Sequence, residues 1–190
     1  ALDTIGRINH IHKSVEHSRE AKIPASAYRD VLYMLIYYSI ASFELLERKM
    51  KAEEKEEVVS DFIQIGRRMN IPDLPFDYHS WQTDYAIHLK NDLEYSEYTR
   101  DLFIQYKKHL GGIRYFLLLE IQRLLVSKTV NNLLDLGRSR IAGIILPFYH
   151  ILRKIKLHNF LIKIMVPSAY RNDIDNMNKY SIAHLVKSNR

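Results

Sequence analysis

The fold is decided by an apolar stretch in the first third of the chain, where residues 31–46 read VLYMLIYYSIASFELL. Spacings of three and four residues, as found here, place side chains on one face of an α-helix. We therefore predict a helix that begins near Ser26 and is buried over residues 31–46. Its expected buried set is Val31, Leu32, Leu35, Ile36, Ile40, Phe43 and Leu46.

The same spacing continues through most of the chain, while the alternation typical of strands is nearly absent. Six glycines and five prolines leave few turns. We predict an all-α, single-domain multi-helix bundle with long buried helices over residues 1–166, followed by a polar tail at 167–190. Further helices are expected at 3–18, 53–69, 80–89, 96–109 and 113–126, then a short one ending at Gly137 and a long one from Ser139 kinked at Pro147. The apolar helix 113–126 is expected near the centre of the fold.

The amino-acid composition excludes several kinds of site and partner. The 190 residues, 47% of them hydrophobic, suffice for a substantial core. The absence of cysteine excludes disulfides, thiolate nucleophiles and zinc–thiolate or iron–sulfur sites. A net charge of +6 is compatible with an anionic partner, but no nucleic-acid-binding motif accompanies it. We therefore expect no nucleic-acid partner.

The N-terminal residues carry no signal-peptide pattern. The longest runs without a charged residue, Val31 to Phe43 and Ile141 to Leu152, are shorter than the roughly 20 residues that cross a bilayer. We predict a cytoplasmic or peripheral membrane protein. The second possibility rests on residues 153–164, where basic residues interleave with apolar ones as in an amphipathic surface helix.

A histidine-containing segment, Arg7-Ile8-Asn9-His10-Ile11-His12-Lys13, lies in the first predicted helix. His12 shares an apolar stripe with Ile5, Ile8 and Val15. On a helix His10 points about 160° away from His12, so the two histidines cannot chelate one ion. The residues alone favour His12 as a hydrogen-bonded core histidine; the alternative is a metal ligand.

Other candidate residues have structural explanations that fit at least as well. Tyr28, Tyr33, Tyr37 and Tyr38 are more typical of packing than of a cofactor site. Asp30 complements the dipole at the start of its helix, or orients an imidazole from the neighbouring helix. No hydrolase or phosphate-binding motif is present, so the catalytic residues stay unassigned.

Taken in order, several of these segments resemble one family. They are RINHIH at 7–12, DVLYML at 30–35, IGRRMNIPDLP at 65–75, and then Trp81 and Tyr85. Together they are similar to the catalytic domain of MpaB-type oxygenases and latex-clearing rubber oxygenases, over about residues 5 to 110. The segment from Gly66 to Pro75 is the most specific part.

The resemblance implies an all-α fold around haem b, with His12 as the proximal iron ligand. It also implies oxidative cleavage, with O₂, of carbon–carbon double bonds in an isoprenoid or other apolar small molecule. Arg7, His10 and Asp30 are then further cofactor-binding candidates, with Asp30 supporting the imidazole of His12.

Two departures from the family pattern bear on this expectation. In the family, residues before the histidine helix supply much of the distal pocket, whereas only eleven residues precede His12. The family's Trp-Arg pair is replaced by the segment from Glu47 to Lys51. Either an N-terminal portion is missing, which we favour, or the haem chemistry has changed or been lost. The alternative function is a non-catalytic helical module that binds a membrane surface or a protein partner through the basic amphipathic C-terminal helix.

Overall fold

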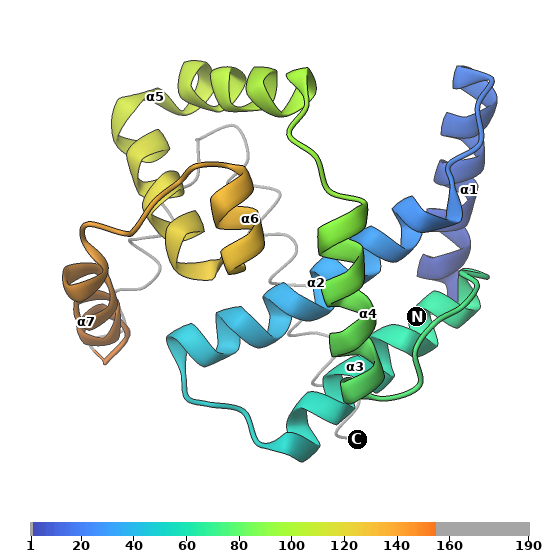
Figure 1. The fold of residues 1–190 in the computed structure, drawn as a ribbon, viewed down its shortest axis with the longest axis horizontal. Coiled ribbons are helices and arrows are strands. Elements are labelled where there is room, and N and C mark those ends of the chain that lie inside the picture. Colours follow the sequence, from blue (N-terminus) through green and yellow to red (C-terminus); the bar gives the residue numbers. More distant parts are fainter. Residues whose placement is uncertain (1, 155–190) are drawn as a thin grey trace. The chain divides into compact units, whose positions relative to one another are not determined.

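The structure, a computed structural model, describes residues 2–154. Within this range the chain forms helices and no strand, which confirms the predicted all-α multi-helix class (Figure 1). The predicted tail 167–190 and most of the basic stretch 153–164 lie outside the described residues. The helices are α1 (Leu2–Arg19), α2 (Ala25–Leu46), α3 (Ala52–Arg68), α4 (Tyr78–Asn91), α5 (Glu97–Leu125), α6 (Lys128–Leu133) and α7 (Ala142–Lys154).

The described chain divides into two compact units. Unit 1 comprises residues up to Tyr95 together with Gln122–Gly137, and unit 2 comprises Ser96–Ile121 together with the residues from Arg138 onward. Unit 1 therefore holds α1 to α4 and α6, while most of α5 and all of α7 belong to unit 2.

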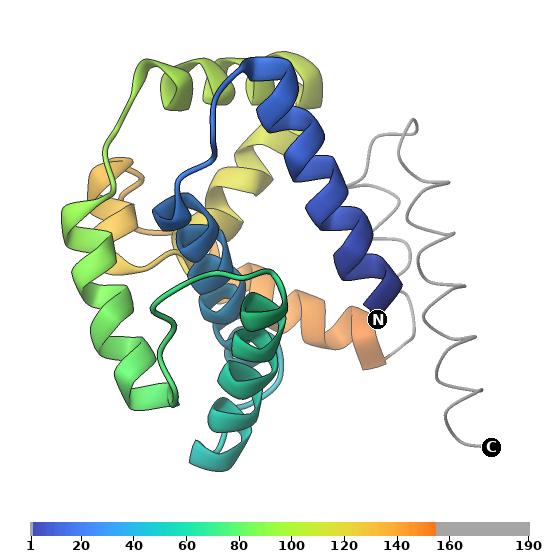
Figure 2. The same ribbon diagram turned by 90° about the vertical axis from the view of Figure 1, so that its right-hand side faces the viewer.

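The core of unit 1 forms where α2, α3 and α4 pack against one another, as Figures 1 and 2 both show. The indole of Trp81 stacks on the ring of Tyr85, with centroids 5.4 Å apart. The buried cluster consists of Leu32, Tyr33, Ile36, Ile40, Val59, Ile63, Ile71, Trp81 and Tyr85.

The predicted core face of α2 is only partly right. Leu32, Ile36 and Ile40 are buried as expected, but Val31 and Leu35 are exposed. The apolar stripe of α2 is wider than the surface that α3 and α4 cover, so its outer edge faces solvent. In α3 the buried apolar residues are Val59 and Ile63, while the neighbouring Val58 and Phe62 are half-buried.

Side chains cap the starts of α4 and α5. Asp77 caps α4, which begins two residues before the predicted start at residue 80, and its Oδ1 accepts a hydrogen bond from the Ser80 amide at 2.7 Å. Ser96, at the predicted start of the next helix, caps α5, and its Oγ accepts from the amide of Thr99.

In unit 2 the predicted break between helices 96–109 and 113–126 appears as a kink in α5, because Gly111 has φ 73° and ψ 172°. The expectation that 113–126 is a central apolar helix is wrong. Its buried residue is Glu120, while Ile113 and Phe116 are exposed. Glu120 Oε2 accepts hydrogen bonds from Ser139 Oγ at 2.7 Å and from the Arg140 amide at 2.9 Å, just before α7. These hydrogen bonds give the buried carboxylate its partners and tie α5 to the segment that leads into α7.

Pro147 lies inside α7, as predicted. None of the described helices is long and apolar enough to cross a bilayer.

Candidate functional site

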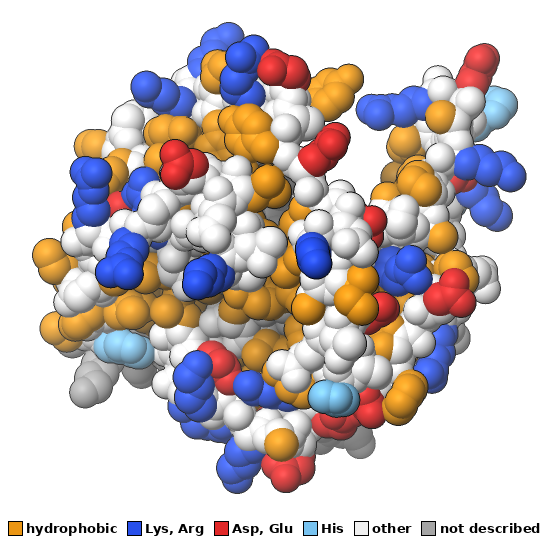
Figure 3. Space-filling model, in the orientation of Figure 1, with side chains coloured by type: hydrophobic (Ala, Val, Ile, Leu, Met, Phe, Trp, Pro, Cys, Tyr) orange, Lys and Arg blue, Asp and Glu red, His pale blue; other side chains and the backbone are white. Residues whose placement is uncertain are grey.

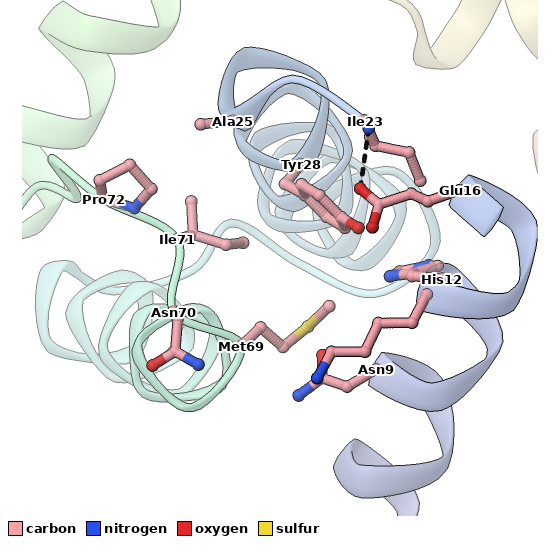
Figure 4. A pocket seen from close by; sticks show the side chains of 11 residues that line it. Asn9, His12, Glu16, Ile23, Ala25, Tyr28, Met69, Asn70, Ile71 and Pro72 are labelled. Atoms are coloured by element: carbon pink, nitrogen blue, oxygen red, sulfur yellow. Dashed lines mark hydrogen bonds between the residues drawn. The ribbon is translucent and has the colours of Figure 1, made fainter. Parts of the chain in front are cut away.

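The candidate site is a pocket of about 270 Å³ in unit 1, between α1, the start of α2 and the end of α3 (Figure 4). It is partly open to solvent. The lining residues that matter for its chemistry are His12, Lys13, Glu16, Tyr28, Met69 and Ile71.

The turn between α1 and α2 is fastened by Glu16. Its Oε1 accepts a hydrogen bond from the backbone N–H of Ile23 at 2.8 Å, drawn as the dashed line in Figure 4. The backbone N–H of Ala21 bonds the carbonyl of Glu16 at 3.2 Å, which closes the end of α1. This turn sets Tyr28, on the first turn of α2, beside the α1 face that carries His12.

The opposite wall depends on Gly66. The amide of Ile71 donates to the Gly66 carbonyl at 3.0 Å, and Asn70 adopts a positive φ of 59° to make the reversal. A Cβ at position 66 would lie 2.7 Å from Leu32 Cδ2 and 2.8 Å from Leu74 Cδ1. Glycine therefore lets the segment after α3 fold back closely, which brings Met69 and Ile71 to the pocket.

His12 lies against Tyr28, with ring centroids 5.0 Å apart and planes tilted by 57°. Its Nδ1 is buried and has no hydrogen-bond partner. Buried polar atoms are usually paired, so such an atom needs an explanation. Trp81 Nε1 is in the same condition, but it lies within the aromatic core of unit 1 and not at the pocket.

Tyr28 is kept in its neutral form. Burial, and secondly the negative charge of Glu16, raise the pKa of the Tyr28 hydroxyl above its ordinary value. At neutral pH the pocket thus presents a phenol, an imidazole, a carboxylate and an ammonium group. Such groups can ligate a metal through the imidazole and hydrogen-bond or pair with a polar ligand.

The other predicted cofactor-binding residues do not lie with His12. Arg7 and His10 are exposed on α1 and are not among the residues that line the pocket. Asp30 was predicted to support His12, but it contacts another histidine: its Oδ1 lies 2.9 Å from His88 Nε2. Of the four predicted residues, the structure brings only His12 to the pocket.

The network around His88 was not foreseen. His88, on α4, is only 6% exposed, and its Nδ1 lies 2.5 Å from Asp92 Oδ2. Its ring meets Tyr33 edge-on, and the Tyr33 hydroxyl donates to Asp84. The spacing of Asp84, His88 and Asp92, four residues apart on one helix face, was the available signal.

This network is a structural connection between α2 and α4. Burial, with the hydrogen bond to Asp84, raises the pKa of Tyr33, so its hydroxyl remains a donor at neutral pH. Within residues 2–154, no group of three His, Asp or Glu side chains is arranged to hold a metal ion.

No protein-family model, curated protein or solved structure matches this chain. The resemblance to MpaB-type and latex-clearing oxygenases accordingly stays a prediction from the sequence.

Proposed function

We propose that this chain is a haem b-dependent oxygenase-like protein that holds haem at the His12 pocket and acts on an apolar substrate, such as an isoprenoid, with O₂. The observation that carries this proposal is the buried, unpartnered Nδ1 of His12 beside an open pocket. An imidazole with an unpartnered ring nitrogen is suited to bind a metal ion, or to form a hydrogen bond with a bound ligand.

The residues at the pocket fit such a group. His12 would hold the iron through its imidazole, and Tyr28, Met69 and Ile71 would offer apolar surface to the rest of the group. The ammonium group of Lys13 offers a positive charge for a propionate. The pocket volume of about 270 Å³ lies just below the roughly 300–1,000 Å³ of typical ligand sites, so the pocket would enclose only part of a group as large as haem.

The roles of the chain's own residues follow from their contacts. The ring of Tyr28 limits the orientations open to the His12 imidazole. Glu16 holds the turn that positions Tyr28 through its hydrogen bond with Ile23. Haem, when bound, would supply the redox chemistry for oxidative cleavage of a double bond.

The second candidate function is the non-catalytic helical module. The observation that favours it is the exposed apolar face of α7, described below.

The test is a haem titration of the full chain, followed by absorption in the Soret region. Two histidines of α1 give a matched pair, since His12 lines the pocket and His10 is exposed outside it. We expect wild type and His10→Ala to bind haem with the same spectrum, and His12→Ala to lose the ligated species while keeping its far-UV circular dichroism. A wild-type chain that gives only the spectrum of free haem, or an unchanged spectrum in His12→Ala, would overturn the proposal.

A further inference from the structure

The helix α7 carries an apolar stripe that faces solvent. Ile144, Phe148 and Ile151 are spaced by four and three residues, so they lie on one face of the helix. Their exposed fractions are 69%, 53% and 57%. Figure 3 shows hydrophobic side chains gathered at the surface where α7 lies. Clustered exposure of this kind, unlike a single exposed leucine, indicates an interaction surface.

Positive charge surrounds this stripe in the sequence. Residues 136–172 include no aspartate or glutamate. Arg138 and Arg140 precede α7 and are exposed, and Arg153 and Lys154 are its last two residues. Lys156, Lys163 and Arg171 follow. An acid-free basic segment around an apolar stripe has the composition of a helix that lies on an anionic bilayer.

The length of α7 also fits a position on the surface of a bilayer. Its 13 residues extend about 20 Å, too short for the roughly 30 Å hydrocarbon core. The apolar face can enter the headgroup region while the helix axis stays parallel to the membrane surface.

We propose that α7 is a membrane-docking helix that inserts Ile144, Phe148 and Ile151 into the surface of a bilayer containing anionic lipids. The proposal does not depend on haem binding, because none of these residues belongs to unit 1.

Two other partners would each match only one of the two features, which are the apolar stripe and the positive charge around it. A second copy of the chain would cover the apolar stripe, but its own α7 segment would bring no carboxylate to Arg138 and Arg140, because residues 136–172 include no aspartate or glutamate. A nucleic acid would meet the charge but has no use for an exposed aliphatic stripe. An anionic membrane surface satisfies both features together.

The experiment is vesicle flotation with the full chain, comparing neutral phosphatidylcholine vesicles with vesicles that also contain phosphatidylserine. Binding is expected on the anionic vesicles and should weaken as salt is added. Ile144→Ser and Phe148→Ser should each weaken partitioning about tenfold, because each removes a large apolar side chain from the inserted face. The double change Arg138→Gln with Arg140→Gln should weaken it about fivefold per charge.

Two exposed apolar residues outside the stripe serve as matched controls. Ile113 on α5 and Phe76 before α4 are each 78% exposed and lie outside the stripe. Ile113→Ser and Phe76→Ser should leave vesicle binding unchanged, and circular dichroism should show that all variants keep their helix content.

Three outcomes would overturn the proposal. The first is a full chain that stays with neither kind of vesicle. The second is equal loss of binding in the stripe variants and the control variants. The third is a change of oligomeric state in Ile144→Ser and Phe148→Ser without any change in vesicle binding, which would assign the stripe to a second copy.

Discussion

Asp30 Oδ1 lies 2.9 Å from Nε2 of His88, and this contact joins the start of α2 to α4. The two residues are 58 positions apart in sequence, and the histidine is almost completely buried while the carboxylate is partly exposed. Asp92 contacts the other ring nitrogen, so both nitrogens of a buried imidazole have acidic partners. The relationship makes Asp30 a structural residue of unit 1 and separates it from the pocket of His12.

Removing this contact should destabilise unit 1. Asp30→Ala leaves Nε2 of His88 without its partner in a buried position, and we expect the free energy of unfolding to fall by about 1 kcal/mol, a value reduced for the exposure of the carboxylate. Urea denaturation followed by fluorescence of the single tryptophan, Trp81, measures this change within the same core. Asp61→Ala, at an exposed position of α3, should change stability by less than about 0.5 kcal/mol. Equal effects of the two substitutions would contradict the structural role of Asp30.

A side chain at Gly66 should destabilise unit 1. In Gly66→Ala the new Cβ would press on the methyl ends of Leu32 and Leu74, and the cost of displacing them, less the helix propensity that alanine gains, should leave a net loss of about 1 kcal/mol. Gly6 in α1 has no heavy atom within 4 Å of a Cβ built at that position, so Gly6→Ala should be neutral or favourable. Thermal denaturation of the two variants makes the comparison. A Gly66→Ala protein as stable as Gly6→Ala would show that the segment after α3 does not pack as described.

Glu120 should stabilise the segment that leads into α7. Its Oε2 accepts from Ser139 Oγ and from the amides of Arg140 and Ile141, so Glu120→Ala leaves several donors without this acceptor and should cost about 2 kcal/mol locally. Hydrogen exchange at the amides of Arg140 and Ile141 reports this loss directly. Exchange there should accelerate in Glu120→Ala and stay unchanged in Asp101→Ala, an exposed position of α5. Unchanged protection in Glu120→Ala would contradict the contact.

Glu44 should make a pH-dependent contribution to the folding stability of unit 1. Hydrogen bonds from Lys49 at 2.8 Å and from Lys55, supported by the Met50 amide, lower the pKa of Glu44 from 4.5 to about 2. Because the folded pKa is depressed, the contribution is fully present above pH 4.5 and is lost as the pH falls toward 2.

The measurement is the stability of wild type against Glu44→Gln across this range. We expect wild type to be more stable by about 1 kcal/mol at pH 6, a value kept low because Lys49 is exposed, and the difference to shrink steadily below pH 4.5. A difference that stays constant from pH 6 to pH 2.5 would mean that the Glu44 contacts do not persist in solution.

The fold class could be predicted because helical periodicity extends along nearly the whole chain. The break between the helices 96–109 and 113–126, which the structure shows as a kink at Gly111, and the helix start at Ser96 could also be predicted from the sequence. Burial was harder to predict, since a wide apolar stripe such as that of α2 does not reveal which edge its neighbours cover; Val31 and Leu35 are exposed for this reason. The burial of Glu120 could not be predicted, because it depends on donors about twenty residues away in the sequence.

Of the residues at the pocket, the sequence drew attention only to His12. Its place on the apolar stripe of α1 favoured a core histidine, and the family resemblance suggested a ligand; the structure shows that it lines the pocket. The walls at Tyr28 and Met69 depend on how α1, α2 and the end of α3 meet, which periodicity within each helix does not determine. The partner of Asp30 required the long-range pairing of α2 with α4.

The proposed ligation is tested most directly by chemical rescue of His12. The measurement is the absorption spectrum of haem-loaded His12→Gly before and after free imidazole is added, with His10→Gly as the control. We expect His12→Gly to lose the wild-type spectrum and imidazole to restore it, since the small ring can enter the space that the side chain leaves, while His10→Gly keeps the wild-type spectrum throughout. A His12→Gly protein whose spectrum equals that of wild type, or a wild-type chain that never departs from the spectrum of free haem, would contradict the account.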